Sequence, residues 1–401
     1  MIGREVARHC APILLLLVSA CSPLPRYDAV PVKLGEQATV QGLSDIRFWA
    51  DTEDTAAMVR ASEEVGRREQ EYLAKSGHRG PLPPANFLAI SGGAENGAFG
   101  AGLLVGWTAA GTRPSFNLVT GVSVGALAAP FAFLGSEYDD ELRHVFTSIS
   151  TGDVLERRSL LAALFQDAIA DNAPLRARIG RYFNQDMLDA IAAEYRKGRV
   201  LLIGTTDLDA RRKVIWNIGA IAERGGPGAL DLVHDILLAS AAIPGVFPPV
   251  MITVEADGRV FQEMHVDGGA SAQVFLYPPS LHLGGTPAER EERLYVIRNA
   301  RLDPGWAQVE RRTLSIAARA ILSLIHSQGV GDLFRIYLTA QRDGHDFNLA
   351  YIPRTFTTEL REPFDTEYMN ELFQLGYDLA AKGYRWEKAP PGFATPQIEP
   401  R

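Results

Sequence analysis

The 401-residue chain alternates short, uninterrupted apolar runs with longer stretches in which apolar residues recur every three to four positions. Short apolar runs predict buried strands, and the helical period predicts amphipathic helices. We expect strands at residues 86–91, 118–120, 200–206, 214–217, 251–254, 259–261, 264–267 and 293–299. We expect helices at residues 52–75, 98–110, 126–133, 159–169, 175–195, 230–242, 314–338 and 365–384. This alternation predicts an α/β fold with a central, mostly parallel sheet.

The segment from residue 86 to residue 133 carries the first candidate for chemistry. It contains Gly121, Ser123 and Gly125 in the pattern Gly-x-Ser-x-Gly, between an expected strand and an expected helix. A serine in this context forms a sharp turn that lifts its hydroxyl above the sheet, and glycines are needed on both sides of it. We therefore predict that Ser123 is a nucleophile. The alternative is a serine that only caps the following helix.

A second turn begins with Gly92-Gly93-Ala94 and ends at Gly97, between the strand expected at 86–91 and the helix expected at 98–110. Attack by a serine on an ester carbonyl places negative charge on oxygen, and backbone N–H groups at a helix N-terminus can stabilise that charge. We predict that Gly92, Gly93 and Ala94 form an oxyanion hole. A nucleotide-binding loop is disfavoured because the segment lacks both Gly-x-Gly-x-x-Gly and a Lys-Ser/Thr pair.

Asp267 ends an expected strand and precedes Gly268 and Gly269. A nucleophilic serine needs a base within hydrogen-bonding reach, and partial burial would raise the proton affinity of an aspartate. We predict that Asp267 is this base. The alternative is a turn aspartate that binds its own backbone.

A histidine could serve as the base instead, in a Ser-His-Asp triad. The candidates lie far apart in the sequence: His234, His265, His282 and His326. No cluster of His, Cys and Asp has the spacing of metal ligands, so we expect neither a metal nor a cofactor.

These motifs occur in the order found in the patatin-like phospholipase family, and residues 87–279 resemble its bacterial branch. Further matches are Pro174-Leu175-Arg176, Gly204-Thr205-Thr206-Asp207, Ala239-Ser240-Ala241-Ala242-Ile243-Pro244 and Phe247-Pro248-Pro249. The resemblance implies a three-layer α/β/α fold and a Ser123–Asp267 dyad that hydrolyses acyl esters of lipids, as in phospholipases A and lysophospholipases. The chain departs from the family at Ala94, where a third glycine is usual, and at Asn96, where a basic residue is usual.

The N-terminus has the pattern of a bacterial lipoprotein signal. Arg4 and Arg8 precede an apolar run at 11–20, and Val18-Ser19-Ala20-Cys21 resembles a lipobox. We expect residues 1–20 to be removed and Cys21 to carry the lipid that anchors the protein to a membrane. Ser22 after the cysteine resembles lipoproteins of the outer membrane, which suggests a protein facing the periplasm. The alternative is an ordinary cleaved signal with a chance cysteine.

Charge narrows the possible partners. The formal net charge is −8 without a basic run, which argues against nucleic acid and gives no overall attraction to an anionic membrane. We expect a tether and surface helix at 21–84, a catalytic domain at 85–283, and an extension packed on the core at 284–401. The sequence leaves the oligomeric state open. It also leaves two other functions open: a non-catalytic envelope lipoprotein that binds lipid or a partner, and an α/β-hydrolase esterase with a triad.

Overall fold

A computed structural model describes residues 24–52, 55–154, 156–157, 167–281 and 290–393. Its centre is one sheet in the order β1-β7-β6-β3-β2-β10-β11. The strands are β1 (Arg47–Trp49), β7 (Arg212–Asn217), β6 (Val200–Asp207), β3 (Leu118–Val122), β2 (Ala85–Ile90), β10 (Glu292–Arg298) and β11 (Asp346–Tyr351). The neighbouring strands β6, β3, β2, β10 and β11 are parallel, whereas β7 pairs antiparallel with both β6 and the edge strand β1. The predicted α/β class with a mostly parallel sheet is confirmed.

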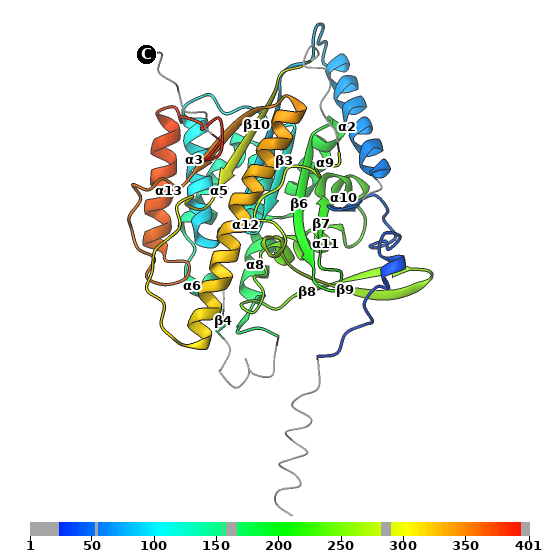
Figure 1. The fold of residues 1–401 in the computed structure, drawn as a ribbon. Helices are drawn as coiled ribbons and strands as arrows, with labels where there is room; N and C mark the ends of the chain where they lie inside the picture. The colour runs from blue at the N-terminus through cyan, green and yellow to red at the C-terminus, as the bar shows by residue number, and fades with distance from the viewer. Residues whose placement is uncertain (1–23, 53–54, 155, 158–166, 282–289, 394–401) are drawn as a thin grey trace, which may run out of the picture.

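Both faces of the sheet are covered, because alternate residues of each strand point to opposite sides. In β2, Leu88 and Ile90 pack into one apolar cluster, and Phe87 and Ala89 contact another. The first cluster lies under α3 (Gly97–Ala109), α4 (Val124–Leu134), α5 (Asp139–Thr147), α8 (Ala173–Tyr182), α9 (Gln185–Arg196), α10 (Ile218–Arg224), α11 (Ala229–Ser240) and α13 (Thr366–Ala381). The second lies under α12 (Thr313–Asp343), which crosses in front of the sheet in Figure 1. The result is an α/β/α arrangement.

The hairpin of β8 (Val250–Ala256) and β9 (Arg259–Asp267) extends the sheet beside β6. The last residues of β9 pair antiparallel with β6, so that Asp267 lies opposite Thr205. We expected two short strands at 259–261 and 264–267, but β9 is continuous. This single strand carries Asp267 from the hairpin to the centre of the sheet.

The remaining elements are the long helix α2 (Ala56–Lys75), the short α6 (Thr151–Val154), β4 (Glu156–Arg157) and β5 (Ala170–Asp171), and 3-10 turns at Val32–Leu34, Ala94–Asn96, Ser136–Tyr138 and Gly268–Ala270. In the described part of the chain, no helix combines the length and apolar character needed to cross a bilayer.

Three further expectations need correction. The helix expected at 175–195 is two helices, because the side chain of Asn184 accepts a hydrogen bond from the Met187 amide and begins α9 there. The sequence patterns did not predict β11 or α10. Part of the expected tether packs on the body: Arg26 bonds to Asp209, and Thr39 pairs with Glu255. Most of the helix expected at 159–169, the signal at 1–20 and Cys21 lie outside the described residues.

The C-terminal helix α13 packs closely against α3, beside it at the left of Figure 1. A Cβ at Gly102 of α3 would lie 2.0 Å from the carbonyl oxygen of Phe373, and one at Gly106 would lie 2.3 Å from that of Tyr377. Only glycine permits this approach of the two backbones. Because α3 begins directly after the glycine turn, α13 supports that turn from behind.

Candidate active site

Ser123 forms the turn between β3 and α4. Its backbone has φ 55° and ψ −128°, a conformation that a non-glycine residue adopts only under strain, at a cost of about 1–3 kcal/mol. A Cβ at Gly121 would lie 2.5 Å from the Gly125 carbonyl oxygen, and one at Gly125 would lie 2.4 Å from that of Ile90. The Gly-x-Ser-x-Gly pattern thus follows from steric exclusion within this turn.

Asp267 lies at the end of β9 with its carboxyl group buried beside Ser123. Its Oδ1 accepts a hydrogen bond from the Gly269 amide at 2.7 Å. Burial raises the pKa of Asp267 to about 6, although the nearby Ser123 hydroxyl and the Gly269 amide lower it in part. Its Oδ2 is buried and has no hydrogen-bond partner among the described residues. The structure thus brings the predicted nucleophile and the predicted base together.

Ser240, the last residue of α11, links the two parts of the site. The Ser123 amide donates to Ser240 Oγ at 3.0 Å, and the Ser240 hydroxyl donates to the Gly204 carbonyl oxygen at 2.8 Å. Two residues further on, the carbonyl oxygen of Ala242 accepts from the Asp267 amide at 2.9 Å. The sequence pointed to this segment as a motif but did not reveal that it holds the backbones of both Ser123 and Asp267.

The glycine turn differs from the expected oxyanion hole in one respect. The Gly92 amide donates to the Gln273 carbonyl oxygen at 2.9 Å, so it is not available to a substrate. The amides of Gly93 and Ala94 donate to no acceptor in the described part of the chain. With the Gly92 amide engaged in this structure, Gly93 and Ala94 are the stronger candidate donors. The Val124 amide, at the start of α4 beside Ser123, is a third candidate that the sequence analysis missed.

Gln273 joins the glycine turn to the segment after Asp267. Besides the bond from Gly92, its side chain donates to the Gly269 carbonyl oxygen at 2.9 Å. Its own amide donates to Asp332 of α12 at 2.7 Å. Gln273 lies six residues beyond Asp267, in a stretch that we expected to carry no strand or helix. Its role depends on these distant contacts, so no signal in the sequence identified it.

Asn299 supports the glycine turn from the neighbouring strand. Its backbone and side-chain amides donate to Ser91, at 2.8 Å and 2.9 Å, and its Oδ1 accepts from the Gly100 amide at 3.0 Å. It follows directly after β10, at the edge where the parallel strands end. This position was a usable signal, because polar residues at the carboxyl ends of neighbouring parallel strands lie close together.

Asn96, at the position of the expected basic residue, is held by α13. Its Oδ1 accepts a hydrogen bond from the Tyr368 hydroxyl at 2.6 Å. The neighbouring Glu95 is partly buried, and this burial raises the pKa of its carboxyl group. The turn therefore offers backbone amides to a substrate but no cationic side chain of its own.

A narrow apolar pocket of about 60 Å³ opens beside Ser123. Its lining, apart from Ser123, is apolar: Ala94, Val124, Leu127, Val145, Phe146, Ile149, Val154, Leu175, Ala241, Ile243, Phe247, Phe364 and Met369. Such a lining suits a hydrocarbon chain better than a charged group. Larger and more polar hollows lie elsewhere on the surface, away from the site.

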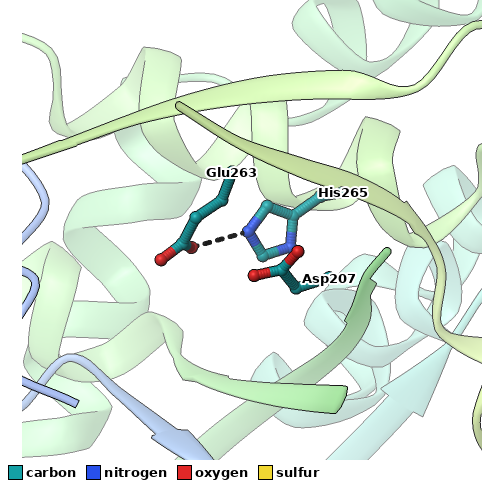
Figure 2. A group of neighbouring side chains, drawn as sticks. All are labelled: Asp207, Glu263 and His265. Carbon is teal, nitrogen blue, oxygen red and sulfur yellow. Dashed lines mark hydrogen bonds and ion pairs between the residues drawn. The ribbon is translucent and has the colours of Figure 1, made fainter. Parts of the chain in front are cut away.

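His265 is engaged on both ring nitrogens and does not complete a triad. Its Nδ1 bonds to Thr205 Oγ1 at 2.9 Å and its Nε2 to Glu263 at 3.0 Å, as Figure 2 shows for Glu263. No histidine in the described part of the chain hydrogen-bonds to Ser123, and His282 lies outside that part. The geometry therefore favours Asp267 over His265 as the base.

Asp207, Glu263 and His265 nevertheless form a buried cluster whose possible ligand atoms lie within 4.8 Å of one another (Figure 2). Arg47 of β1 pairs with both carboxylate oxygens of Glu263. Although burial opposes it, hydrogen bonding from His265 and Arg47 lowers the pKa of Glu263 to about 2. A metal ion would have to displace this arginine, so the cluster is better described as an ion-pair network that fastens β1 to β9.

Comparison with known proteins gives one match that agrees with this geometry, a match to a family model. Residues 88–278 match the model of the family described as "Patatin-like phospholipase". No curated protein matches the chain. Among solved structures, VipD from Legionella pneumophila has 12% sequence identity and a TM-score of 0.38, with 75% of this chain and 66% of VipD covered. The type III effector protein ExoU has 13% identity and a TM-score of 0.23, with 75% of this chain and 53% of ExoU covered. The chain thus spans less than two thirds of each, and similarities this low carry no argument about the reaction.

Proposed function

The chain carries a patatin-like phospholipase domain over residues 88–278, and from this premise we propose that it is a serine hydrolase of lipid acyl esters with a Ser123–Asp267 dyad. One observation supports the dyad above all. Ser123, on a strained turn, lies beside the buried carboxyl group of Asp267, and its hydroxyl lowers the pKa of that group. An alcohol and a base of suitable pKa, with unpaired backbone amides nearby, are the parts that acyl transfer requires.

The reaction proceeds in two steps. Ionised Asp267 takes the proton from Ser123 Oγ as this oxygen attacks the ester carbonyl carbon, and the Gly93 and Ala94 amides stabilise the oxyanion. The C–O bond to the alcohol then breaks, and Asp267 returns the proton to the departing oxygen. Asp267 next takes a proton from water, which attacks the acyl-enzyme, and the fatty acid leaves as Ser123 regains its proton. A pKa of about 6 leaves Asp267 mostly ionised at neutral pH.

The apolar pocket supports an acyl chain as the group bound beside Ser123. The absence of a cation at Asn96 and the burial of Glu95 give no attraction to an anionic headgroup at this corner of the site. We therefore expect the enzyme to depend on the acyl chain more than on headgroup charge, with activity of the phospholipase A or lysophospholipase type. A panel of glycerophospholipids, lysophospholipids and neutral esters would test this ranking.

The central experiment measures hydrolysis of a short p-nitrophenyl ester. Ser123→Ala and Asp267→Asn should each lose nearly all turnover, while circular dichroism shows an unchanged fold. His265→Gln, which alters the alternative base, should keep turnover if the protein remains folded. Activity retained in either dyad variant would refute the mechanism.

A fluorophosphonate probe separates the enzyme from a non-catalytic binding protein, because only an activated serine reacts with it. Wild-type protein should be labelled at Ser123, and Ser123→Ala should not. An unlabelled wild-type protein would favour the lipid-binding alternative.

The site of action belongs to the proposal as well. Cleavage before Cys21 and its lipidation would place the enzyme on a bacterial envelope membrane, on the periplasmic side. Mass spectrometry of the mature N-terminus should find a lipid-modified Cys21, and Cys21→Ser should abolish incorporation of radiolabelled palmitate. An unmodified N-terminus at any other residue would contradict this.

A further inference from the structure

The first half of α12 is a long apolar surface that nothing in the described structure covers. In the second half, Gly329, Leu333 and Ile336 pack on the sheet. The same helical face continues toward the N-terminus at three- and four-residue spacing through Ile325, Leu322 and Ala318, all of which are exposed. We define the α12 patch as Trp306, Ile316, Ile321, Leu322, Leu324 and Ile325, which are all exposed.

The patch lies at the catalytic edge of the sheet. The strands β10 and β11 are parallel neighbours, and α12 connects them, so α12 begins at the edge where β10 ends. The glycine turn after β2 and Ser123 after β3 lie at that same edge, because both strands are parallel to β10. In Figure 1 the N-terminal end of α12, in yellow, is at the lower end of the molecule with α6 and β4.

The charge of this segment is opposite to that of the whole protein. Residues 304–331 contain Arg311, Arg312 and Arg319 against Glu310 alone, a net charge of +2 in a chain of net charge −8. Arg319 donates to the carbonyl oxygen of Gly305, which brings the neighbouring Trp306 alongside the helix. Trp306 itself is 89% exposed. A helix with Trp, Leu and Ile on its surface and arginines beside them has the composition of one that lies in a membrane interface.

We infer that the α12 patch docks the catalytic edge of the protein onto an anionic lipid surface. Electrostatics favours this occupant over a second copy of the chain, because two copies would bring two segments of +2 charge together. The inference extends the proposed function, since docking here would bring the opening beside Ser123 to the bilayer. Binding itself does not require catalysis, and it does not require the lipid at Cys21.

The first test is co-sedimentation with vesicles of phosphatidylcholine, with and without phosphatidylglycerol. The protein begins at residue 21 and carries Cys21→Ser, so that no acyl anchor contributes. Wild-type protein should bind the anionic vesicles, and Leu322→Gln with Ile325→Gln should weaken binding by roughly tenfold or more. Leu338→Gln is the matched control, because Leu338 is 55% exposed on the opposite face of the second half of α12. Equal binding by wild type and the double variant would overturn the inference.

The second test uses the fluorescence of Trp306. Its emission should shift to the blue with anionic vesicles, and the shift should disappear in Trp306→Phe. Ser123→Ala should bind as wild type does, and the double variant should hydrolyse a soluble ester normally but a vesicle ester slowly. Should no variant hydrolyse any ester, the proposed function fails while the docking result stands. Should the double variant only convert a dimer to a monomer, with vesicle binding unchanged, a second copy is the occupant and the inference is wrong.

Discussion

The buried carboxyl group of Asp267 should contribute less to the stability of the folded protein at neutral pH than at acidic pH. Its pKa is about 6 in the folded protein against an ordinary value of 3.8. Burial of protonated Asp267 carries no electrostatic penalty. As pH rises from 3.8 to 6, ionisation of Asp267 is disfavoured in the folded state and the free energy of unfolding falls. Above pH 6 this loss stays constant. At 1.36 kcal/mol for each pH unit between the two pKa values, the full cost is about 3 kcal/mol, of which about 2 kcal/mol develops between pH 4 and pH 8.

Asp267→Asn removes this cost, because the amide has no ionised form. Its oxygen can still accept the Gly269 bond, so the packing remains nearly the same. The free energy of unfolding, from urea titrations, should therefore rise in the variant relative to wild type by about 2 kcal/mol more at pH 8 than at pH 4. This quantity is a double difference: variant minus wild type, at pH 8 minus pH 4. It cancels the contributions of all other titrating groups and any pH-independent effect of the amide on the free energy of unfolding.

A carboxylate with the opposite shift provides the control. Hydrogen bonds from Ser150 and an ion pair with Arg178 lower the pKa of Asp153 to about 2. Its ionised form stabilises the folded protein, and this contribution is lost as pH falls toward 2. Almost all of this loss falls below pH 4, so the corresponding difference for Asp153→Asn between pH 8 and pH 4 should be close to zero. If Asp267→Asn shows no such difference, as expected for Asp153→Asn, or a negative one, Asp267 is not a buried base held ionised at a cost.

Three further predictions follow from the site. With a soluble ester, kcat/KM of the wild type should rise through a midpoint near pH 6 and level off above it, because Asp267 must be ionised to act. A midpoint near pH 4, the ordinary value for an aspartate, would contradict this. Ser240→Ala should lower the free energy of unfolding by about 1–3 kcal/mol in thermal unfolding and should also lower kcat, because the buried hydroxyl that binds the Ser123 amide is lost. A stable variant with normal kcat would show that Ser240 does not position the nucleophile. Ala94→Gly should retain activity and raise the free energy of unfolding by about 0.5–1 kcal/mol, because the φ of 48° at Ala94 strains an alanine but not a glycine. A loss of stability would indicate that the greater unfolded-state entropy of glycine outweighs this strain.

The sequence predicted the fold class and most elements, and it pointed to both members of the proposed dyad, because these depend on local rules. Apolar runs and helical periods identified the parallel strands and their helices, and the sharp turn at Ser123 excludes side chains at Gly121 and Gly125 whatever surrounds it. The glycines after Asp267 likewise marked a backbone that must turn as soon as the strand ends. The predictions were less accurate where two local signals conflicted. At residues 175–195 the apolar residues keep a helical period throughout, yet Asn184 caps and begins a second helix there.

Only the tertiary structure decided how these parts act together. The register of β9 on β6 places Asp267 beside Ser123, and this register depends on pairings between residues far apart in the chain. The Gln273 carbonyl occupies the Gly92 amide, which removes one predicted oxyanion donor, and no local pattern contains that bond. The sequence likewise did not reveal that the first half of α12 is exposed. Its apolar residues follow the same period as the buried half, and only the extent of the body beneath the helix determines which of them meet protein.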